Sequence, residues 1–268
     1  MKYKLFISDY DGTLGVAPEN SIDEQTLAAI NEFTNKGGIF VVCSGRETSS
    51  LMRILKKCSV KGIAATFQGA RITEIETGKV LFKGGLDKES ALVALDAVED
   101  SGLTPIAYDD DGLYVQEKNP YVSFYENAVE LDGRVTDIRA EVQRQGDRVS
   151  KICWLGDDEV VNKVADKLNE KFKGERISFN SGAKCLLEAI NPEHSKNNAV
   201  RFIADYYNVP LNQVIAVGDS TNDIALIDGP WHGVAVGDGR DELKAVADEI
   251  TVPFKDKPVK VLLEKYCL

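Results

Sequence analysis

The chain has 268 residues, of which 43% are hydrophobic and 28% charged, an ordinary composition for a globular protein of one large or two modest domains. Its 32 basic and 43 acidic residues give a net charge of −11, which weighs against nucleic acid or an anionic membrane as a partner. The sequence shows no signal-peptide pattern and no apolar run of the roughly 20 residues that a membrane helix needs. We therefore expect a soluble cytoplasmic protein, whose oligomeric state the sequence does not determine.

Cysteine and histidine usage limits the kinds of metal site that the chain can form. The five cysteines are scattered, none forms a Cys-x-x-Cys pair, and there are only two histidines. These numbers argue against a disulfide framework and against a zinc site of cysteine and histidine ligands. Any metal is expected on oxygen ligands, which suits magnesium.

The opening strand ends in two aspartates, Asp9 and Asp11, followed by a glycine turn. Alternate residues of an extended chain point the same way, so both carboxylates are expected to project from the strand end. At about 4 Å and an effective dielectric near 20, like charges repel by roughly 4 kcal/mol, so the pair requires a cation, a proton or a lysine. On its own the stretch is also typical of a solvated turn. It does not fit an EF-hand loop, because Leu14 and Asn20 stand where that loop needs glycine and glutamate.

Strands and helices alternate in the first part of the chain. After the opening strand we expect a helix capped at Ser21, a strand over 39–43, a helix over 47–57, a strand over 63–66, and a hairpin of 71–75 with 79–82. The strand over 39–43 is apolar throughout, as expected for a parallel strand covered on both faces. This alternation predicts a doubly wound α/β layer.

The pattern changes after a hinge at residues 83–85. Between 87 and 190 we expect a helix, two strands around a turn at 109–112, two helical pieces, a strand over 149–155, a helix over 158–172 and a closing hairpin. This section is interpreted as a separate α+β domain inserted into the first. The acidic run Asp109-Asp110-Asp111 could hold a metal, but a solvated hairpin turn is the favoured interpretation.

Strand and helix alternate again after Asn191-Pro192. We expect a helix over 195–207, a strand over 214–217, a helix from about 221, a strand over 234–236, a helix over 241–247, a short strand over 249–252 and a last helix. The two outer segments, 1–83 and 191–268, most simply form one mostly parallel sheet around the inserted segment 84–190. The predicted fold class is therefore α/β.

Polar residues follow three of the apolar strands. They are Asp9 and Asp11 after the first strand, Ser44 and Gly45 after the second, and residues 219–223 after the strand over 214–217. Ligands of open parallel sheets bind at the carboxyl ends of the strands. If these strands are neighbours, one crevice holds four carboxylates, a hydroxyl and several backbone N–H groups.

These motifs resemble those of the haloacid dehalogenase (HAD) superfamily of phosphatases, in the Cof-like subgroup with a large inserted cap (subfamily IIB, C2-type cap). The matching segments are Asp9-Tyr10-Asp11-Gly12-Thr13-Leu14, Ser44-Gly45-Arg46, Lys196 and Gly218-Asp219-Ser220-Thr221-Asn222-Asp223, in the family's order. The resemblance covers the full length. It implies a Rossmann-like core of residues 1–83 and 191–268, with 84–190 as the cap.

The resemblance also implies roles for the acidic residues. Asp9 would be the nucleophile and form an aspartyl phosphate, because a carboxylate is ionised at neutral pH. Asp11 would protonate the leaving oxygen and then deprotonate the attacking water. Magnesium would lie on the Asp9 carboxylate, the Asp11 backbone carbonyl and Asp219, with Asp223, Asn222 and Thr13 as supporting residues.

The remaining matches would hold the substrate. Ser44, the Gly45 amide and Lys196 would bind the phosphate oxygens. Arg46 is expected either as a substrate contact or as the partner of an ion pair. Gln68 is a further candidate contact, and it departs from the family, whose members usually carry Asn-Gly-Ala where this chain has Gln68-Gly69-Ala70.

The resulting hypothesis is a magnesium-dependent phosphomonoesterase that acts on a small phosphorylated metabolite, with sugar phosphates the expected class. The inserted domain would exclude water and select the leaving group. A phosphosugar mutase with the same aspartyl phosphate is the nearest alternative. A protein that binds a phosphorylated ligand without catalysis, and a signalling receiver domain, are alternatives of another class. A receiver needs only about half this length and carries its acceptor aspartate on a middle strand.

Overall fold

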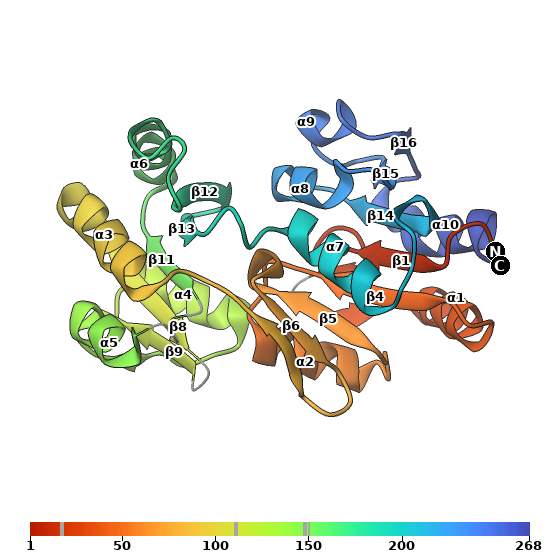
Figure 1. The fold of residues 1–268 in the computed structure, drawn as a ribbon. Coiled ribbons are helices and arrows are strands. Elements are labelled where there is room, and N and C mark those ends of the chain that lie inside the picture. The colour runs from red at the N-terminus through yellow and green to blue at the C-terminus, as the bar shows by residue number, and fades with distance from the viewer. Residues whose placement is uncertain (17–18, 110–111, 147–148, 150) are drawn as a thin grey trace. The chain divides into compact units, whose positions relative to one another are not determined.

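A computed structural model describes residues 1–16, 19–109, 112–146, 149 and 151–268 (Figure 1). The chain forms two compact units: a core unit of Met1–Lys83 and Ser195–Leu268, and a cap unit of Gly84–His194. The sequence placed the second boundary at residue 190, whereas the cap unit extends to His194. The reason is local, because the Gly85 N–H donates to His194 Nδ1 at 2.9 Å and ties the returning chain to the outgoing one.

The core unit is built on a sheet in the order β16-β15-β14-β1-β4-β5-β6-β7. Its strands are β1 Leu5–Ser8, β4 Ile39–Cys43, β5 Ile63–Thr66, β6 Arg71–Glu74, β7 Val80–Lys83, β14 Val214–Gly218, β15 His232–Ala235 and β16 Glu249–Ile250. All neighbouring pairs from β16 to β5 are parallel, and β6 and β7 add an antiparallel hairpin. The predicted mostly parallel sheet from two outer segments is confirmed. The chain leaves β1 toward one face of the sheet and leaves the neighbouring β14 toward the other, which creates a crevice at the carboxyl ends of these two strands.

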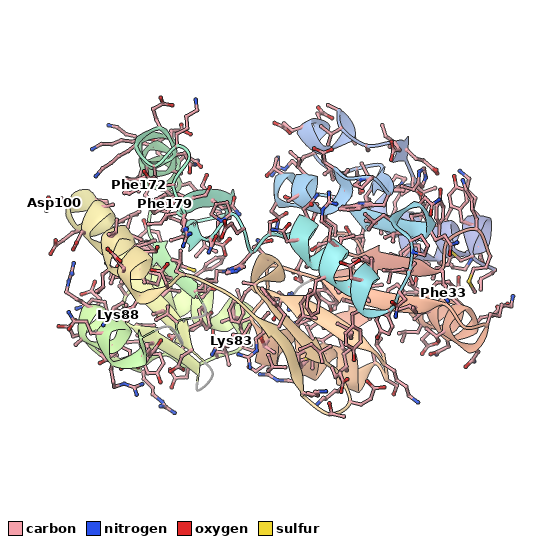
Figure 2. All side chains as sticks on the ribbon, in the orientation of Figure 1. Phe33, Lys83, Lys88, Asp100, Phe172 and Phe179 are labelled. Carbon is pink, nitrogen blue, oxygen red and sulfur yellow. The ribbon has the colours of Figure 1, made fainter. Side chains whose placement is uncertain are left out.

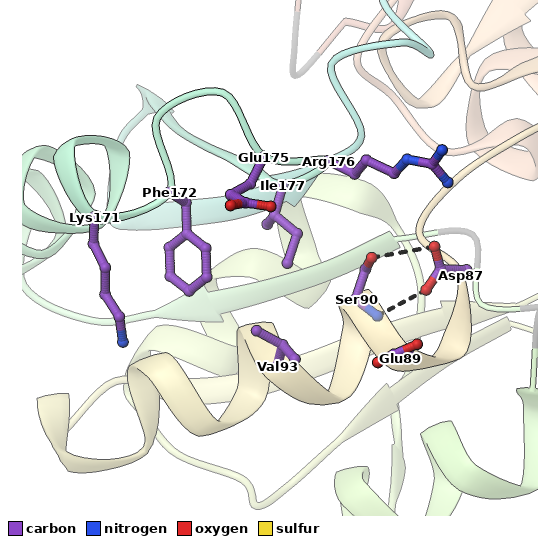
Figure 3. A pocket seen from close by; sticks show the side chains of 9 residues that line it. All are labelled: Asp87, Glu89, Ser90, Val93, Lys171, Phe172, Glu175, Arg176 and Ile177. Carbon is purple, nitrogen blue, oxygen red and sulfur yellow. Dashed lines mark hydrogen bonds between the residues drawn. The ribbon is translucent and has the colours of Figure 1, made fainter.

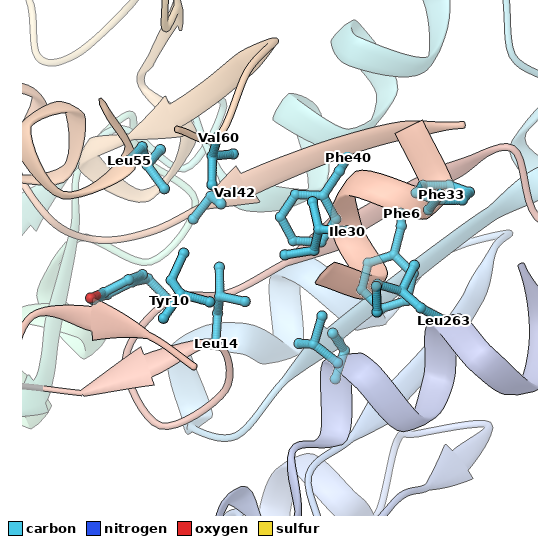
Figure 4. Packing of buried hydrophobic residues seen from close by; sticks show 14 of the residues in the cluster. Phe6, Tyr10, Leu14, Ile30, Phe33, Phe40, Val42, Leu55, Val60 and Leu263 are labelled. Carbon is cyan, nitrogen blue, oxygen red and sulfur yellow. The ribbon is translucent and has the colours of Figure 1, made fainter. Parts of the chain in front are cut away.

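Helices cover both faces of the core sheet. They are α1 Glu24–Asn35, α2 Thr48–Lys57 and α10 Pro258–Tyr266 on one face, and α7 Lys196–Tyr206, α8 Ile224–Ile227 and α9 Asp241–Lys244 on the other. Alternation along the strands divides the side chains between the faces, so Phe6 packs with Phe33 and Phe40 while Leu5 and Ile7 face α7. Figure 4 shows the first of these clusters. Burial on both faces explains why the strands are apolar throughout.

The start of α1 differs from the sequence prediction. Asp23, and not Ser21, caps the helix, and its carboxylate accepts the backbone N–H groups of Gln25 and Thr26. Ser21 instead belongs to β3 (Ser21–Ile22), which pairs with β2 (Gly15–Val16). The Ser-x-x-Glu pattern was a misleading signal because an aspartate with the same capping chemistry follows two residues later.

The cap unit contains a second sheet, in the order β10-β9-β8-β11-β13-β12. Its strands are β8 Thr104–Asp109, β9 Gly112–Val115, β10 Arg134–Val135, β11 Lys151–Leu155, β12 Ser178–Ala183 and β13 Leu186–Ile190, and its helices are α3 Lys88–Val98, α4 Pro120–Val129, α5 Ile138–Gln145 and α6 Asp158–Lys171. Phe172 and Phe179 lie together in its separate hydrophobic core (Figure 2). The predicted α+β character is confirmed, whereas residues 110–111 of the predicted acidic turn lie outside the described residues.

Short 3-10 segments complete the described structure. They are η1 Phe67–Gly69, η2 Glu99–Ser101, η4 Leu211–Gln213, η5 Thr221–Asp223 and η6 Phe254–Asp256. Two of them, η1 and η5, lie next to motifs that the sequence singled out. None of the helices in the described ranges combines the length and apolar character that crossing a membrane requires.

Candidate active site

Three of the predicted motifs follow adjacent strands of the core sheet. Ser8, the last residue of β1, is in register with Val42 of β4 on one side and Val217 of β14 on the other. The Asp9 N–H donates to the Val217 carbonyl at 2.9 Å, so the residue after β1 is fixed beside the end of β14. The segments that carry Asp9, Ser44 and Asp219 therefore begin side by side, as the sheet order requires.

Lys196 links two buried carboxylates at this edge. Its Nζ lies 2.6 Å from Asp9 Oδ1 and 2.6 Å from Asp223 Oδ1, and its side chain is 1% exposed. Ser195 caps α7, which makes Lys196 the first residue of that helix. Burial disfavours the charged amine, but Asp223 and Asp9 outweigh it and raise the pKa of Lys196 above its ordinary value. Lys196 is therefore a permanent positive charge beside Asp9.

Asp9 lies in a buried and strongly acidic environment. Burial and the charge of Asp223 raise the pKa of Asp9 well above its ordinary value, although Lys196 acts in the opposite direction. One ammonium thus does not compensate the carboxylates around it. A ligand of the site must therefore compensate an excess of negative charge.

Asp219 faces the turn that follows Asp11. Its Oδ1 accepts a hydrogen bond from Thr13 Oγ1 at 3.0 Å. Burial, followed by the charge of Asp223, raises the pKa of Asp219 to about 6. Gly12 has φ +77°, and a Cβ on it would lie 2.4 Å from Asp219 Oδ2. Glycine is therefore required at position 12 both by the backbone conformation and by the close approach of this carboxylate.

Asp223 orders the loop after β14. Its Oδ1 pairs with Lys196, while its Oδ2 accepts the backbone N–H groups of Asp219 and Ser220, both at 3.1 Å. Both carboxylate oxygens are thus engaged within the protein. This geometry is that of a residue that positions Lys196 and Asp219.

Asp11 takes a different direction from Asp9, contrary to the expectation that both project into one space. Its carboxylate accepts two hydrogen bonds from Arg46, at 2.8 Å from Nε and 2.7 Å from Nη2, and the side chain is 47% exposed. The extended strand ends at Ser8, and the chain turns at Gly12, whose N–H donates to the Gly15 carbonyl at 2.9 Å. The period-two alternation therefore does not continue to Asp11. Of the two roles expected for Arg46, the structure shows the ion pair.

Tyr10 is a part of the site that sequence reasoning missed. It is fully buried, and the Arg46 guanidinium lies 4.8 Å from the centre of its ring, a cation–π arrangement. Tyr10 thus supports the ion pair of Arg46 with Asp11. The position of this aromatic residue, between the two aspartates of the first motif, could have indicated that it belongs to the site.

The segment after β4 is held by the segment after β5. The Gln68 N–H donates to the Ser44 carbonyl at 3.1 Å, and the Phe67 N–H donates to the Arg46 carbonyl at 2.9 Å. The Ser44 hydroxyl accepts the Arg46 N–H at 3.2 Å. The expected phosphate-binding residues Ser44 and Gly45 therefore lie in a braced loop, with Gln68 as their neighbour.

The donor set of the site fits a magnesium ion. Carboxylate oxygens of Asp9, Asp219 and Asp223 lie within 4.8 Å of one another. Oxygen-only donors suit a hard divalent cation. The cluster contains two more carboxylates than cations, and its members are Asp9, Asp11, Asp219, Asp223, Lys196 and Arg46. In addition, the buried Asn222 Oδ1 has no hydrogen-bond partner among the described residues, which leaves an oxygen available to the surroundings of an ion.

A hollow in the cap unit offers different chemistry (Figure 3). It lies between α3 and the segment after α6, and its lining consists of Asp87, Glu89, Ser90, Val93, Lys171, Phe172, Glu175, Arg176 and Ile177. Its acidic side chains outnumber its basic ones, which disfavours an anionic substrate there.

Comparisons with known proteins agree with the fold and the motifs. The family model for haloacid dehalogenase-like hydrolases matches residues 6–262. A protein of Klebsiella pneumoniae (strain 342) named HMP-PP phosphatase is 24% identical over 249 residues, which cover 93% of this chain and 89% of that protein.

Solved structures show the same fold along the whole chain. A haloacid dehalogenase-like hydrolase from Bacteroides thetaiotaomicron superposes with a TM-score of 0.84 at 23% identity, over 98% of this chain and 99% of that one. A structure described as a HAD subclass IIB sugar phosphatase gives a TM-score of 0.82 at 18% identity, over 98% of both chains. The chain therefore belongs to the haloacid dehalogenase-like hydrolases, and its full-length relatives support the prediction that it is a phosphatase of this family.

Proposed function

We propose that the protein is a magnesium-dependent phosphomonoesterase that acts on small phosphorylated metabolites, with sugar phosphates as the expected class. The observation that supports this most is the position of Lys196, buried between Asp9 and Asp223 next to Asp219. This arrangement combines a fixed nucleophile, a fixed cation and a set of oxygen ligands, which phosphoryl transfer requires.

Asp9 is the nucleophile in this proposal. One of its carboxylate oxygens attacks phosphorus, the bond from phosphorus to the ester oxygen breaks, and an aspartyl phosphate forms. The contact with Lys196 and the backbone hydrogen bond to Val217 fix its orientation before the substrate arrives. Attack of water on phosphorus then regenerates Asp9 and releases inorganic phosphate.

Asp11 handles the protons of both steps. In the first step it gives a proton to the leaving oxygen, and in the second it accepts a proton from the attacking water. Its half-exposed side chain allows contact with groups that enter from solvent, while Arg46 limits its orientations. Arg46 thus acts on the reaction through Asp11.

The remaining site residues bind the phosphate group or hold the metal ligands in place. Ser44, the Gly45 N–H and Lys196 hold the phosphate oxygens. Asp9, Asp219 and the Asp11 backbone carbonyl would hold magnesium, which would supply positive charge against the phosphoryl group. Asp223 and Thr13 hold Asp219 in place, and the unpartnered Oδ1 of Asn222 is the third supporting group.

Phosphate release from a panel of compounds tests the proposal. The panel contains sugar monophosphates and HMP-PP, which the name of the Klebsiella relative suggests. Each compound is assayed with magnesium and with EDTA, and without a bisphosphate activator. We expect magnesium-dependent release from sugar monophosphates.

Other outcomes favour the alternatives. Isomerised sugar phosphate without free phosphate would favour a phosphosugar mutase, which returns the phosphoryl group to its substrate. Binding of these compounds without any turnover would favour a protein that binds a phosphorylated ligand without catalysis.

A further inference from the structure

The Gln68 side chain lies against Gly45, in the loop after β4 that we propose binds phosphate. A Cβ on Gly45 would lie 2.5 Å from Gln68 Nε2 and 3.0 Å from Gln68 Cδ, so the amide occupies the space over this glycine. The Gln68 residue is 8% exposed, and its Oε1 is buried without a hydrogen-bond partner among the described residues. Buried amide oxygens without a partner are uncommon because they are costly.

The backbone that carries Gln68 is also strained. Phe67 and Gln68 have φ angles of 51° and 58°, in the left-handed region that residues with a Cβ rarely adopt. Gly69 follows at φ +96°, and a Cβ on it would lie 2.6 Å from the Ser195 carbonyl oxygen. The segment is therefore confined between the Ser44 loop and the start of α7.

This confinement places one neutral amide between two elements that we assign to phosphate binding. Strain and an unpaired polar group together are typical of a functional position, where a ligand completes the interactions. The terminal torsion of glutamine is broad, so rotation of the amide can present either its oxygen or its nitrogen to a ligand.

The charges nearby indicate what kind of group Gln68 meets. Lys196 is paired with Asp9 and Asp223, and Arg46 is paired with Asp11. No cation of this described cluster is left for a second anionic group of the substrate. A neutral amide, with one acceptor and one donor group, matches a hydroxyl, which also donates and accepts.

We propose that Gln68 is a specificity-determining residue that hydrogen-bonds a hydroxyl of the leaving group. This hydroxyl is on the carbon adjacent to the one that bears the phosphate. The substrate class is then the monophosphate of a polyhydroxylated alcohol. This inference rests on the proposed function, because it assigns the leaving group of that same reaction.

Two matched substrate pairs test Gln68. They are glucose 1-phosphate with 2-deoxyglucose 1-phosphate, and glycerol 1-phosphate with the monophosphate of propane-1,3-diol. Each pair is assayed with wild type, with Gln68→Met, which keeps the length and removes the amide, and with Gln213→Met, which makes the same change at an exposed site. We expect wild type to prefer the hydroxylated member of at least one pair by about tenfold in kcat/KM.

The variant separates recognition from structural support. Gln68→Met is expected to lose this preference through a higher KM for the hydroxylated member, with the deoxy member changed by no more than about twofold. Its melting temperature should not fall, because the substitution removes an unpaired oxygen. An equal loss for both members, a lower melting temperature with the preference retained, or no preference in wild type overturns the proposal.

Binding distinguishes failure of this inference from failure of the proposed function. Calorimetric titration of the same pairs into Asp9→Asn, with and without Gln68→Met, measures recognition without turnover. A preference for the hydroxylated member that disappears with Gln68→Met supports the inference even if wild type releases no phosphate. Equal affinities for both members, or no binding, overturn it.

Discussion

At the scale of single residues, the site depends on buried charge that the protein compensates only in part. Lys196 contacts Asp9 and Asp223, yet burial and mutual repulsion still raise the pKa of Asp9 and of Asp219. The ionised forms of both carboxylates are therefore disfavoured in the metal-free protein. The excess negative charge is what the proposed magnesium ion would neutralise, and the partial compensation makes the consequences of removing each charge predictable.

Removal of Lys196 should be severe. Lys196→Met leaves two buried carboxylates without their shared partner, so we expect the free energy of unfolding to fall by about 3–5 kcal/mol and phosphate release to be lost. Urea unfolding at pH 7 measures the first effect. Lys260→Met, which breaks a helix-surface pair with Glu264, serves as the control and should cost no more than about 0.5 kcal/mol. Equal unfolding midpoints for Lys196→Met and wild type would contradict the buried ion pair.

Asp219 should make the metal-free protein less stable as pH rises. Its pKa is about 6 in the folded chain against an ordinary 3.8, so the folded state binds the proton more tightly than the unfolded state. The free energy of unfolding therefore decreases between about pH 4 and pH 6, by about 3 kcal/mol. In EDTA at pH 7, Asp219→Asn should melt at a higher temperature than wild type, and magnesium should stabilise only wild type. A variant that melts lower than wild type in EDTA would count against this electrostatic account.

At the scale of elements, tight turns at strand ends bring the motifs together. The turn after β1 approaches Asp219 so closely that position 12 has no room for a side chain. The loops after β4 and β5 are cross-linked by backbone hydrogen bonds, as described for Ser44 and Gln68. Replacing a glycine of these turns by alanine, which adds a single methyl group, should therefore disturb the site.

Alanine variants of Gly12 and Gly37 distinguish the effect of backbone strain from the effect of a contact with Asp219. Both have positive φ, at +77° and +87°, but a Cβ on Gly37 has no neighbour within 4 Å, whereas one on Gly12 meets Asp219. Each alanine variant should lose about 1 kcal/mol from backbone strain. Gly12→Ala should in addition weaken magnesium binding by about tenfold, as measured by the magnesium dependence of melting temperature. Equal magnesium affinity in both variants would show that the contact with Asp219 does not matter.

At the scale of the whole molecule, the sequence predicted the mostly parallel α/β core because apolar strands and turn residues are local signals. It did not predict that Asp11 turns to Arg46, that Asp23 caps α1, or that His194 ends the cap unit. Each of these depends on hydrogen bonds between residues that the pattern alone does not pair. The motif residues were identified through the resemblance, but their orientations required the folded chain.

Glu249 joins the edge of the core sheet to the C-terminal helix. Its carboxylate accepts hydrogen bonds from Lys265 at 2.8 Å and Tyr266 at 2.5 Å, and lies 3.1 Å from His232 Nε2. Burial opposes ionisation, but these hydrogen bonds prevail and lower the pKa of Glu249 to about 2.

The stabilisation from Glu249 should be present above its ordinary pKa of 4.5 and be lost as pH falls toward about 2. Glu249→Gln should therefore lower the free energy of unfolding by about 1 kcal/mol at pH 7, and by much less at pH 3. Denaturant titrations at both pH values measure this, with Glu264→Gln as a surface control. A cost that is the same at both pH values would mean that the charge of Glu249 is not what stabilises this junction.

The rate of phosphate release by Asp9→Asn tests the central claim most directly. The substitution removes the nucleophilic oxygen and also a buried charge whose pKa is raised, so the variant should fold at least as well as wild type. With the best substrate of the panel and saturating magnesium, we predict a loss on the order of 10³-fold or more. A folded Asp9→Asn that retains turnover within about tenfold of wild type would contradict nucleophilic catalysis by Asp9.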